Sequence, residues 1–140
     1  MSDQKVVLST GASSSVGQST ARLLSQRGYK VFGTSRNDST AQAMPTIEML
    51  ALDVRSDESV AACVKAANRG GRIDVLVNNA AYELAGALEE TSLEEAREQF
   101  ETNFFGVIRM MKAVLPSMRQ RKQGRIINVS SLSGRSAIPL

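Results

Sequence analysis

The residues of this sequence that could carry chemistry are hydroxyls, carboxylates, amides and cations. The 140 residues include no histidine and one cysteine, Cys63. These two facts exclude an intrachain disulfide, a metal site built from thiolates or imidazoles, and a Ser-His-Asp triad. Two segments rich in small and hydroxyl residues stand out instead, STGASSSVG at 9–17 and NVSSLSG at 128–134.

Segment 9–17 has the composition of a phosphate-binding turn between a strand and a helix. Gly11 permits a tight turn and Gly17 permits the helix to pack closely, while backbone N–H groups that open a helix face an anion. No Gly-Lys-Ser/Thr follows, so the pattern is not that of a P-loop. A purely structural turn has the same composition, and that alternative stays open.

The residue that follows the second apolar run distinguishes between nucleotides. Sites for NAD or for S-adenosylmethionine usually carry an acid there, which holds the ribose hydroxyls. This chain has TSRN at 34–37, with Arg36 in that place. Because a guanidinium suits a 2′-phosphate, the sequence favours NADP(H) over NAD(H). A solvated surface arginine is the alternative interpretation.

The elements that must position these residues alternate along the chain. Five apolar, β-branched runs predict short buried strands at 5–9, 30–34, 47–52, 73–78 and 125–130. Between most of them, apolar residues recur at helical spacing. Strands that alternate with helices need crossover connections, which predicts an α/β fold with a parallel sheet covered on both faces. The longest helical stripe follows a candidate N-cap, Ser92, and contains Leu93, Ala96, Phe100, Phe104, Val107, Ile108, Met111, Leu115 and Met118.

Composition and charge limit the possible partners. The start of the chain lacks the features of a signal peptide, and no apolar run is long enough to cross a bilayer, so we expect a soluble, cytoplasmic protein without a membrane partner. The net charge is +3, and the densest basic cluster, RQRKQGR at 119–125, lies where a helix is expected to end. Cations there favour the helix dipole, so we do not expect nucleic-acid binding.

Five segments, taken in order, resemble the motifs of the short-chain dehydrogenases/reductases, a family of NAD(P)-dependent oxidoreductases with a Rossmann-type fold. TGASSSVG resembles the family's Thr-Gly-x-x-x-Gly-x-Gly loop, and LDV at 52–54 resembles its adenine-contacting segment. NNAA at 78–81, NFFG at 103–106 and NVSSLSG resemble the three later motifs. The resemblance implies a doubly wound sheet with strand order 3-2-1-4-5. It also implies that residues 1–140 form one incomplete dinucleotide-binding domain, without the family's C-terminal strands and helices.

The resemblance implies a cofactor site at the carboxyl ends of the strands. Asp53 would accept a hydrogen bond from the adenine amino group, although an acid at a helix entry can also pair with a local N–H. Asn79 and Ala80 would lie along the adenosine ribose, and Asn78 would tie neighbouring strands together. The implied cofactor-binding residues are Gly11, Ser13, Ser14, Ser15, Val16, Gly17, Arg36, Asp53, Val54, Asn79, Ala80 and Ala81.

The resemblance also implies two catalytic residues. Ser131 would hydrogen-bond a substrate carbonyl and stabilise the developing alkoxide, and its alternative role is a cap at the end of a strand. Asn103 would hold a water in a proton relay, and its alternative role is a purely structural amide. The implied reaction is hydride transfer between NADP(H) and a small-molecule carbonyl or secondary alcohol.

The sequence departs from the family pattern at three points. Ser15 replaces the middle glycine of the first motif, and Ala81 replaces the last glycine of Asn-Asn-Ala-Gly. The family's Tyr-x-x-x-Lys motif is not found in the 140 residues, because Tyr29 and Tyr82 are followed four residues later by glycines. We therefore expect this chain to bind cofactor at most and to be inactive by itself. The alternative is a non-catalytic NADP(H)-binding module that acts as a sensor or interaction partner.

The same resemblance predicts association. The last strand, at 124–130, would have an unpaired edge, and a helix face that carries Met110, Met111, Val114 and Met118 would have no cover. We therefore expect a homo-oligomer.

Overall fold

Five parallel strands form one sheet in a computed structural model of the chain, which describes residues 4–36, 45–70 and 72–136. The order across the sheet is β3-β2-β1-β4-β5, as expected from the family resemblance. Each predicted strand is present, with ends that differ by no more than two residues from the prediction. The strands are β1 (Val6–Ser9), β2 (Lys30–Ser35), β3 (Ile47–Ala51), β4 (Val75–Asn78) and β5 (Arg125–Asn128).

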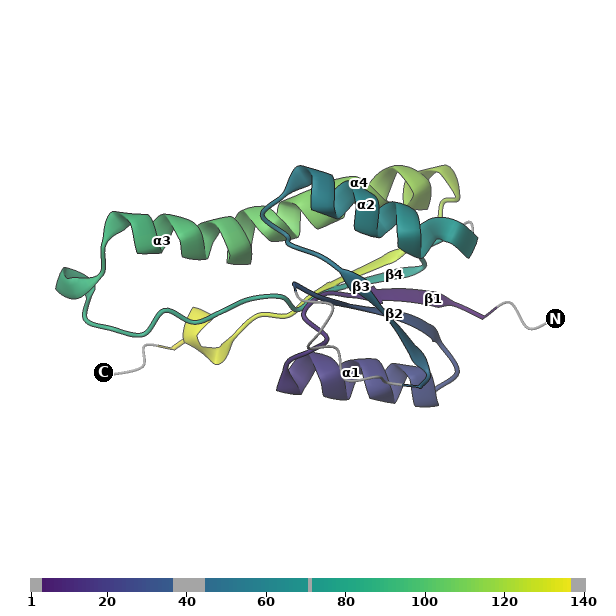
Figure 1. The fold of residues 1–140 in the computed structure, drawn as a ribbon, viewed down its shortest axis with the longest axis horizontal. Helices are drawn as coiled ribbons and strands as arrows, with labels where there is room; N and C mark the ends of the chain where they lie inside the picture. The colour runs from purple at the N-terminus through teal and green to yellow at the C-terminus, as the bar shows by residue number, and fades with distance from the viewer. Residues whose placement is uncertain (1–3, 37–44, 71, 137–140) are drawn as a thin grey trace.

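Helices cover both faces of the sheet (Figure 1). Helix α1 (Ser15–Gln26) lies on one face, and α2 (Asp57–Ala67) lies with α4 (Gly106–Gln120) on the other. Neighbouring strand residues point to opposite faces, so Val7 packs on the α1 side and Leu8 packs on the α2–α4 side. The sheet is therefore buried between two layers, which is why its strands are apolar runs and not alternating patterns.

The long predicted helix consists of three parts that follow one another without a break. Helix α3 (Leu93–Phe100) is followed by a π-helical segment, η4 (Glu101–Phe105), and then by α4. The predicted N-cap is confirmed, because Ser92 and Glu95 form a reciprocal capping box. Shorter 3₁₀ turns complete the chain at η2 (Asn68–Gly70), η3 (Leu88–Glu90) and η5 (Leu132–Gly134).

The predicted apolar stripe of this helix is wrong at four of its nine positions, which are exposed, and only Met118 of the nine is fully buried. Leu93, Phe100 and Phe104 are 69%, 59% and 52% exposed, whereas the buried residues of α4 are Gly106, Met110, Val114 and Met118. Figure 1 shows the reason, since α3 extends beyond the sheet and only α4 lies over it. The π-helical segment also changes the phase of the helix, because it takes more residues per turn.

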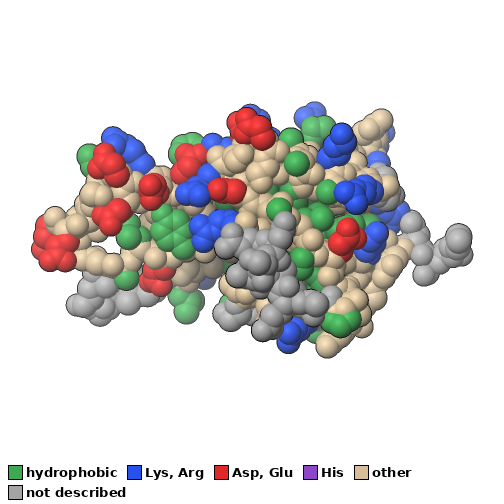
Figure 2. Space-filling model, in the orientation of Figure 1, with side chains coloured by type: hydrophobic (Ala, Val, Ile, Leu, Met, Phe, Trp, Pro, Cys, Tyr) green, Lys and Arg blue, Asp and Glu red, His purple; other side chains and the backbone are tan. Residues whose placement is uncertain are grey.

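The expected uncovered methionine face is likewise wrong. Met110, Val114 and Met118 are at most 5% exposed and belong to the core on the α2–α4 side. The expected strand edge is confirmed, because β5 is the last strand of the described sheet and its Ile127 is 44% exposed. Figure 2 shows in addition that acidic side chains gather at the end of the molecule that carries α3.

The N-terminal ends of the strands are held by one buried carboxylate, Asp74. Its Oδ2 accepts hydrogen bonds from the backbone N–H of Val6 (2.8 Å) and from Arg72 Nε (2.9 Å), and its Oδ1 accepts one from Arg121 (3.2 Å). Arg121 belongs to the basic cluster at 119–125 and also donates to the Ile73 carbonyl oxygen.

In the part of the chain that the structure describes, no helix has the length and apolar character of a membrane span.

Candidate functional site

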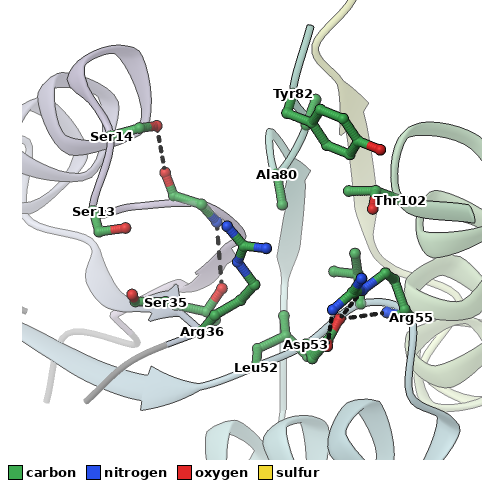
Figure 3. Close-up of a pocket in the computed structure, with 14 residues that line it drawn as sticks. Ser13, Ser14, Ser35, Arg36, Leu52, Asp53, Arg55, Ala80, Tyr82 and Thr102 are labelled. Carbon is green, nitrogen blue, oxygen red and sulfur yellow. Dashed lines mark hydrogen bonds and ion pairs between the residues drawn. The ribbon is translucent and has the colours of Figure 1, made fainter. Parts of the chain in front are cut away.

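A pocket lies at the carboxyl ends of the strands, where the first four of them lead into loops or helices (Figure 3). Eight of the predicted cofactor-binding residues line it: Gly11, Ser13, Ser14, Arg36, Asp53, Val54, Ala80 and Ala81. Val16 and Gly17 do not line it but lie in the first turn of α1, and Asn79 precedes the lining residue Ala80. Neither Asn103 nor Ser131 lines it. The Ser15 side chain lies outside what the structure describes, although its backbone begins α1.

The loop after β1 makes the turn that its glycines predicted. Gly11 has φ +67°, a left-handed conformation that favours glycine, and its N–H faces Thr34 Oγ1 at 3.3 Å. A side-chain carbon at Gly17 would overlap the Gly11 carbonyl oxygen and lie 2.6 Å from Asn79 Nδ2. The start of α1 therefore packs directly on the loop, as Gly17 predicted.

The first turn of α1 is suited to an anion. Ser14 is the N-cap residue, but its hydroxyl donates to the Gly11 carbonyl oxygen (3.0 Å) and makes no capping bond to the helix. No acidic side chain lies in this described first turn. The opening N–H groups thus have no acceptor from the side chain of the cap, and the cap residue Ser14 lines the pocket.

Thr10 joins this loop to the segment that follows β4. Its Oγ1 accepts hydrogen bonds from the backbone N–H groups of Asn79 and Ala80, both at 2.9 Å. The Asn79 amide donates to the carbonyl oxygens of Thr10 and Gly11, both at 3.2 Å. Asn78 donates to Asn128 Oδ1 at 2.9 Å, so it ties β4 to β5 as expected. These contacts fix one wall of the pocket against another.

Three charged side chains stand on the remaining walls. Arg36 follows β2, while Asp53 and Arg55 follow β3, and Figure 3 shows Arg36 and the Asp53–Arg55 pair on opposite sides of Leu52. Arg55 holds the Asp53 carboxylate through both of its oxygens (3.0 and 2.9 Å). The hydrogen bond from the Arg55 guanidinium, together with the Arg55 N–H, lowers the pKa of Asp53 against the opposing effect of burial. Asp53 therefore has the local partner that the alternative interpretation expected, and its Oδ2 can accept one further hydrogen bond.

Asn103 lies in the π-helical segment η4, and its amide finds two partners. Its Oδ1 accepts from the backbone N–H of Tyr82 (3.1 Å), and its Nδ2 donates to the Tyr82 carbonyl oxygen (2.8 Å). Tyr82 itself lines the pocket. Asn103 thus attaches η4 to the segment that follows β4, and the geometry fits a structural amide beside the pocket.

Ser131 lies beyond the end of β5 and is exposed. Its hydroxyl accepts from the Ser133 N–H and donates to Ser133 Oγ, both at 3.2 Å, so it caps the short turn η5. This is the capping geometry that the sequence left open as an alternative. In Figure 1 the segments that follow β4 and β5 run along the same side of the molecule, beneath α3.

Sequence reasoning missed six residues of the pocket wall. Three of them lie within the recognised motifs TSRN and LDV, and the other three directly adjoin LDV, NNAA or NFFG, so these neighbouring positions were the available signal. For Arg55 and Thr102 this signal was weak, because a charged or hydroxyl residue beside a motif is usually solvated. The six are Thr34, Ser35, Leu52, Arg55, Tyr82 and Thr102.

A comparison with protein families agrees with the order of the motifs and with the geometry of the pocket. The model of the short chain dehydrogenases matches residues 5–140. The chain belongs to the short-chain dehydrogenase family. Its relatives include the 3-ketodihydrosphingosine reductase of Bacteroides thetaiotaomicron, which is 46% identical over 136 residues. The 3-oxoacyl-acyl-carrier-protein reductase of Vibrio cholerae is 42% identical over 136 residues.

Solved structures of short-chain dehydrogenases have the same fold. An actinorhodin polyketide ketoreductase with NADPH superposes with a TM-score of 0.92 at 35% identity, and ElxO with NADP bound superposes with 0.90 at 33% identity. These matches cover 99% and 97% of this chain but 57% and 59% of those proteins. The two curated relatives are matched over 96% and 93% of this chain and over 50% and 56% of their own length. The chain therefore spans about half the length of the short-chain dehydrogenases that it matches.

Proposed function

We propose that this chain is the NADP(H)-binding part of a short-chain dehydrogenase that transfers hydride between the nicotinamide and a small-molecule carbonyl or secondary alcohol. The observation that carries the proposal is that Arg36, the glycine loop after β1 and Asp53 line one pocket. A cation, a set of open N–H groups and an acceptor are the three groups that a phosphorylated adenosine needs. The reductases among its relatives support the class of reaction.

The residues of the pocket fit the dinucleotide in parts. Gly11, Ser13 and Ser14 surround the start of α1 and would hold the pyrophosphate. Asp53 and Val54 would lie at the adenine, and Asn79, Ala80 and Ala81 would follow the ribose toward the nicotinamide. Arg36 would pair with the 2′-phosphate, because no acid of the described pocket stands at the end of β2 to compete for it. The bound nicotinamide supplies the hydride that the chemistry needs.

The two candidate catalytic residues have different tasks in this proposal. Ser131 would donate a hydrogen bond to the substrate oxygen, after its hydroxyl leaves Ser133. Asn103 would keep the segment around Tyr82 in place and, as in the family, hold a water. No tyrosine paired with a lysine four residues later is found in the 140 residues, so the chain by itself lacks a general acid.

A titration of both cofactors tests the proposal. NADPH should bind this chain more tightly than NADH, by roughly 1–3 kcal/mol, the range for a hydrogen bond to a charged group. Arg36→Asp should reverse the order, because the carboxylate repels the 2′-phosphate and accepts hydrogen bonds from ribose hydroxyls. Arg22→Asp is a matched control, since Arg22 is an exposed arginine of α1 outside the pocket. It should leave the preference unchanged.

The same preparation tests the absence of turnover. The 140-residue chain should not oxidise NADPH in the presence of a panel of aldehydes and ketones.

Three outcomes would contradict these proposals. Equal affinities for NADPH and NADH would contradict the role of Arg36, and binding of neither would contradict the proposed cofactor. Turnover in proportion to the concentration of this chain would contradict the missing general acid.

We also propose that the protein is a homo-oligomer. Support comes from the exposed edge strand β5 and from apolar side chains around α3 that are in solvent, such as Phe100 and Phe104.

A further inference from the structure

Asp53 and Arg55 form a two-pronged ion pair on the wall of the pocket (Figure 3). Arg55 Nε donates to Asp53 Oδ1 at 3.0 Å, and Arg55 Nη2 donates to Oδ2 at 2.9 Å. The backbone N–H of Arg55 also donates to Oδ1, at 3.0 Å. A carboxylate can accept about four hydrogen bonds. Arg55 takes three of these places, and the one that remains is on Oδ2.

We propose that Arg55 is a positioning residue that makes Asp53 a reader of the purine 6-position. By filling both sites of Oδ1, Arg55 leaves the carboxylate with a single acceptor site to offer to the pocket. That site matches one N–H donor, such as the 6-amino group of adenine. The inference rests on the proposed binding of NADP(H) and on the contact between Asp53 and adenine that the family resemblance implies. What it adds is that Arg55 sets the selectivity of this contact.

The chemistry of the pair explains why it would discriminate. A 6-oxo purine presents a lone pair where adenine presents an N–H, so it meets the carboxylate with repulsion and without a hydrogen bond. Arg55 strengthens this effect, because its guanidinium and its N–H lower the pKa of Asp53 and keep the group an acceptor. A free carboxylate can rotate away from a 6-oxo group, whereas a carboxylate held at both oxygens keeps its remaining acceptor site in a fixed direction.

Arg55 and Arg36 have different roles, and the ion pair of Arg55 contributes little to the stability of the fold. Arg36 stands at the end of β2 on the other side of Leu52. Its target in the proposed function is a phosphate, so we expect the preference between NADPH and NADH to depend on Arg36 more than on Arg55. The side chains of Arg55 and Asp53 are 42% and 34% exposed, and exposed pairs contribute little to stability. Loss of the pair should therefore show in recognition more than in folding.

The test compares NADPH with its deaminated form, in which a 6-oxo group replaces the adenine amino group. The unaltered chain should bind the deaminated form about tenfold more weakly, as expected for one lost hydrogen bond to a charged group. In Arg55→Leu this ratio should fall below about threefold. Arg55→Lys should give an intermediate ratio, because an ammonium keeps the charge without the two-pronged geometry. Both variants should keep the preference for NADPH over NADH.

Arg97→Leu is the matched control. Arg97 is also an exposed arginine in an ion pair, with Glu94 of α3, and it does not line the pocket. Its variant should keep the full tenfold ratio. An unchanged ratio in Arg55→Leu, or equal binding of the two forms to the unaltered chain, would overturn the inference. If Arg55→Leu does not fold, the ratio for Arg55→Lys decides in its place.

Failure of this inference can be separated from failure of the proposed function. A chain that prefers NADPH over NADH but does not distinguish the 6-amino from the 6-oxo form keeps its proposed cofactor and loses the role of Arg55. A chain that binds none of the nucleotides overturns both.

Discussion

At the scale of single residues, the two glycines around the α1 N-terminus set the shape of the phosphate end of the pocket. Gly11 takes a left-handed conformation, and a Cβ at that position would also lie 2.9 Å from the Ala80 Cα. Gly17 has no room for a side chain between the Gly11 carbonyl and the Asn79 amide. Both glycines are thus required by the backbone around them and not only by a ligand.

Substitution of Gly17 by alanine should destabilise the fold. The added methyl group meets the backbone of the loop, which can move only by disturbing the Thr10–Asn79 contacts, so we expect a loss of about 1–3 kcal/mol in the free energy of unfolding. Urea denaturation measures it. Gly86→Ala is the control, since only Thr91 Oγ1 lies near, at 3.8 Å, and its effect should stay within about 0.5 kcal/mol. If the two variants are equally stable, the loop moves at no cost in free energy and the prediction for Gly17 is wrong.

At the scale of elements, Asp74 joins three pieces of the fold at the end of the sheet opposite the pocket. It is 5% exposed and binds the N–H of Val6 in β1, Arg72 before β4 and Arg121 after α4. Burial raises the pKa of Asp74, but the Val6 N–H and the two arginines outweigh it, so the net pKa is lowered. Asp74 therefore links the start of the sheet to the end of the helix that covers it.

The lowered pKa of Asp74 predicts an acid-sensitive contribution to stability. A carboxyl group whose pKa is lower in the folded than in the unfolded chain stabilises the fold above the unfolded value of about 3.9. That stability is lost as the pH falls through the folded pKa. Asp74→Asn should lower the stability at neutral pH by up to about 3 kcal/mol and should flatten the loss of stability below about pH 4.

Chemical denaturation over a series of pH values measures this effect. Asp57→Asn is a matched control, because Asp57 also pairs with an arginine, Arg109, but is 82% exposed. This variant should change little in the free energy of unfolding at neutral pH or in its decrease at acid pH. If Asp74→Asn and the unaltered chain lose stability equally as the pH falls, the role of Asp74 is contradicted.

At the scale of the whole molecule, the sheet ends on an open strand. Ile127 and Val129 are 44% and 49% exposed, and Leu132 beyond them is 83% exposed. The other apolar surface lies at the far end, where Phe104 contacts Phe100 and Phe105 (ring centroids 6.3 and 5.2 Å apart). Neither surface includes Met110 or Met118 of α4, which are inside the core, and Met111 packs against that core.

The open strand predicts self-association. An exposed edge with apolar side chains pairs readily with another strand, so the chain should sediment as more than a monomer at micromolar concentration. Ile127→Lys should shift it toward the monomer, because a charge on the edge opposes pairing. Leu88→Lys is the control, since Leu88 is 88% exposed on the separate turn η3. A monomer in the unaltered chain, or an equal shift in both variants, would contradict association through β5.

The sequence by itself determined the strands, the family and most of the pocket. These features depend on residues that are close together in the chain, such as the apolar run before Gly11 or the position of Arg36 directly after β2. A short run of β-branched residues predicts a strand wherever it later lies, and a motif carries its own local turn. For this reason eight predicted residues line one pocket in the structure.

Only the tertiary structure decided which side chains are paired and which are covered. Asn103 binds Tyr82 across 21 residues, and Asn79 binds Thr10 across 69, so no local pattern contains these contacts. The sequence also placed Phe100 and Phe104 on an apolar stripe, yet both are exposed. Periodicity shows which residues share a helix face, but burial requires another surface opposite that face. The sheet lies beneath α4 and ends before α3, and this placement is a property of the assembled chain.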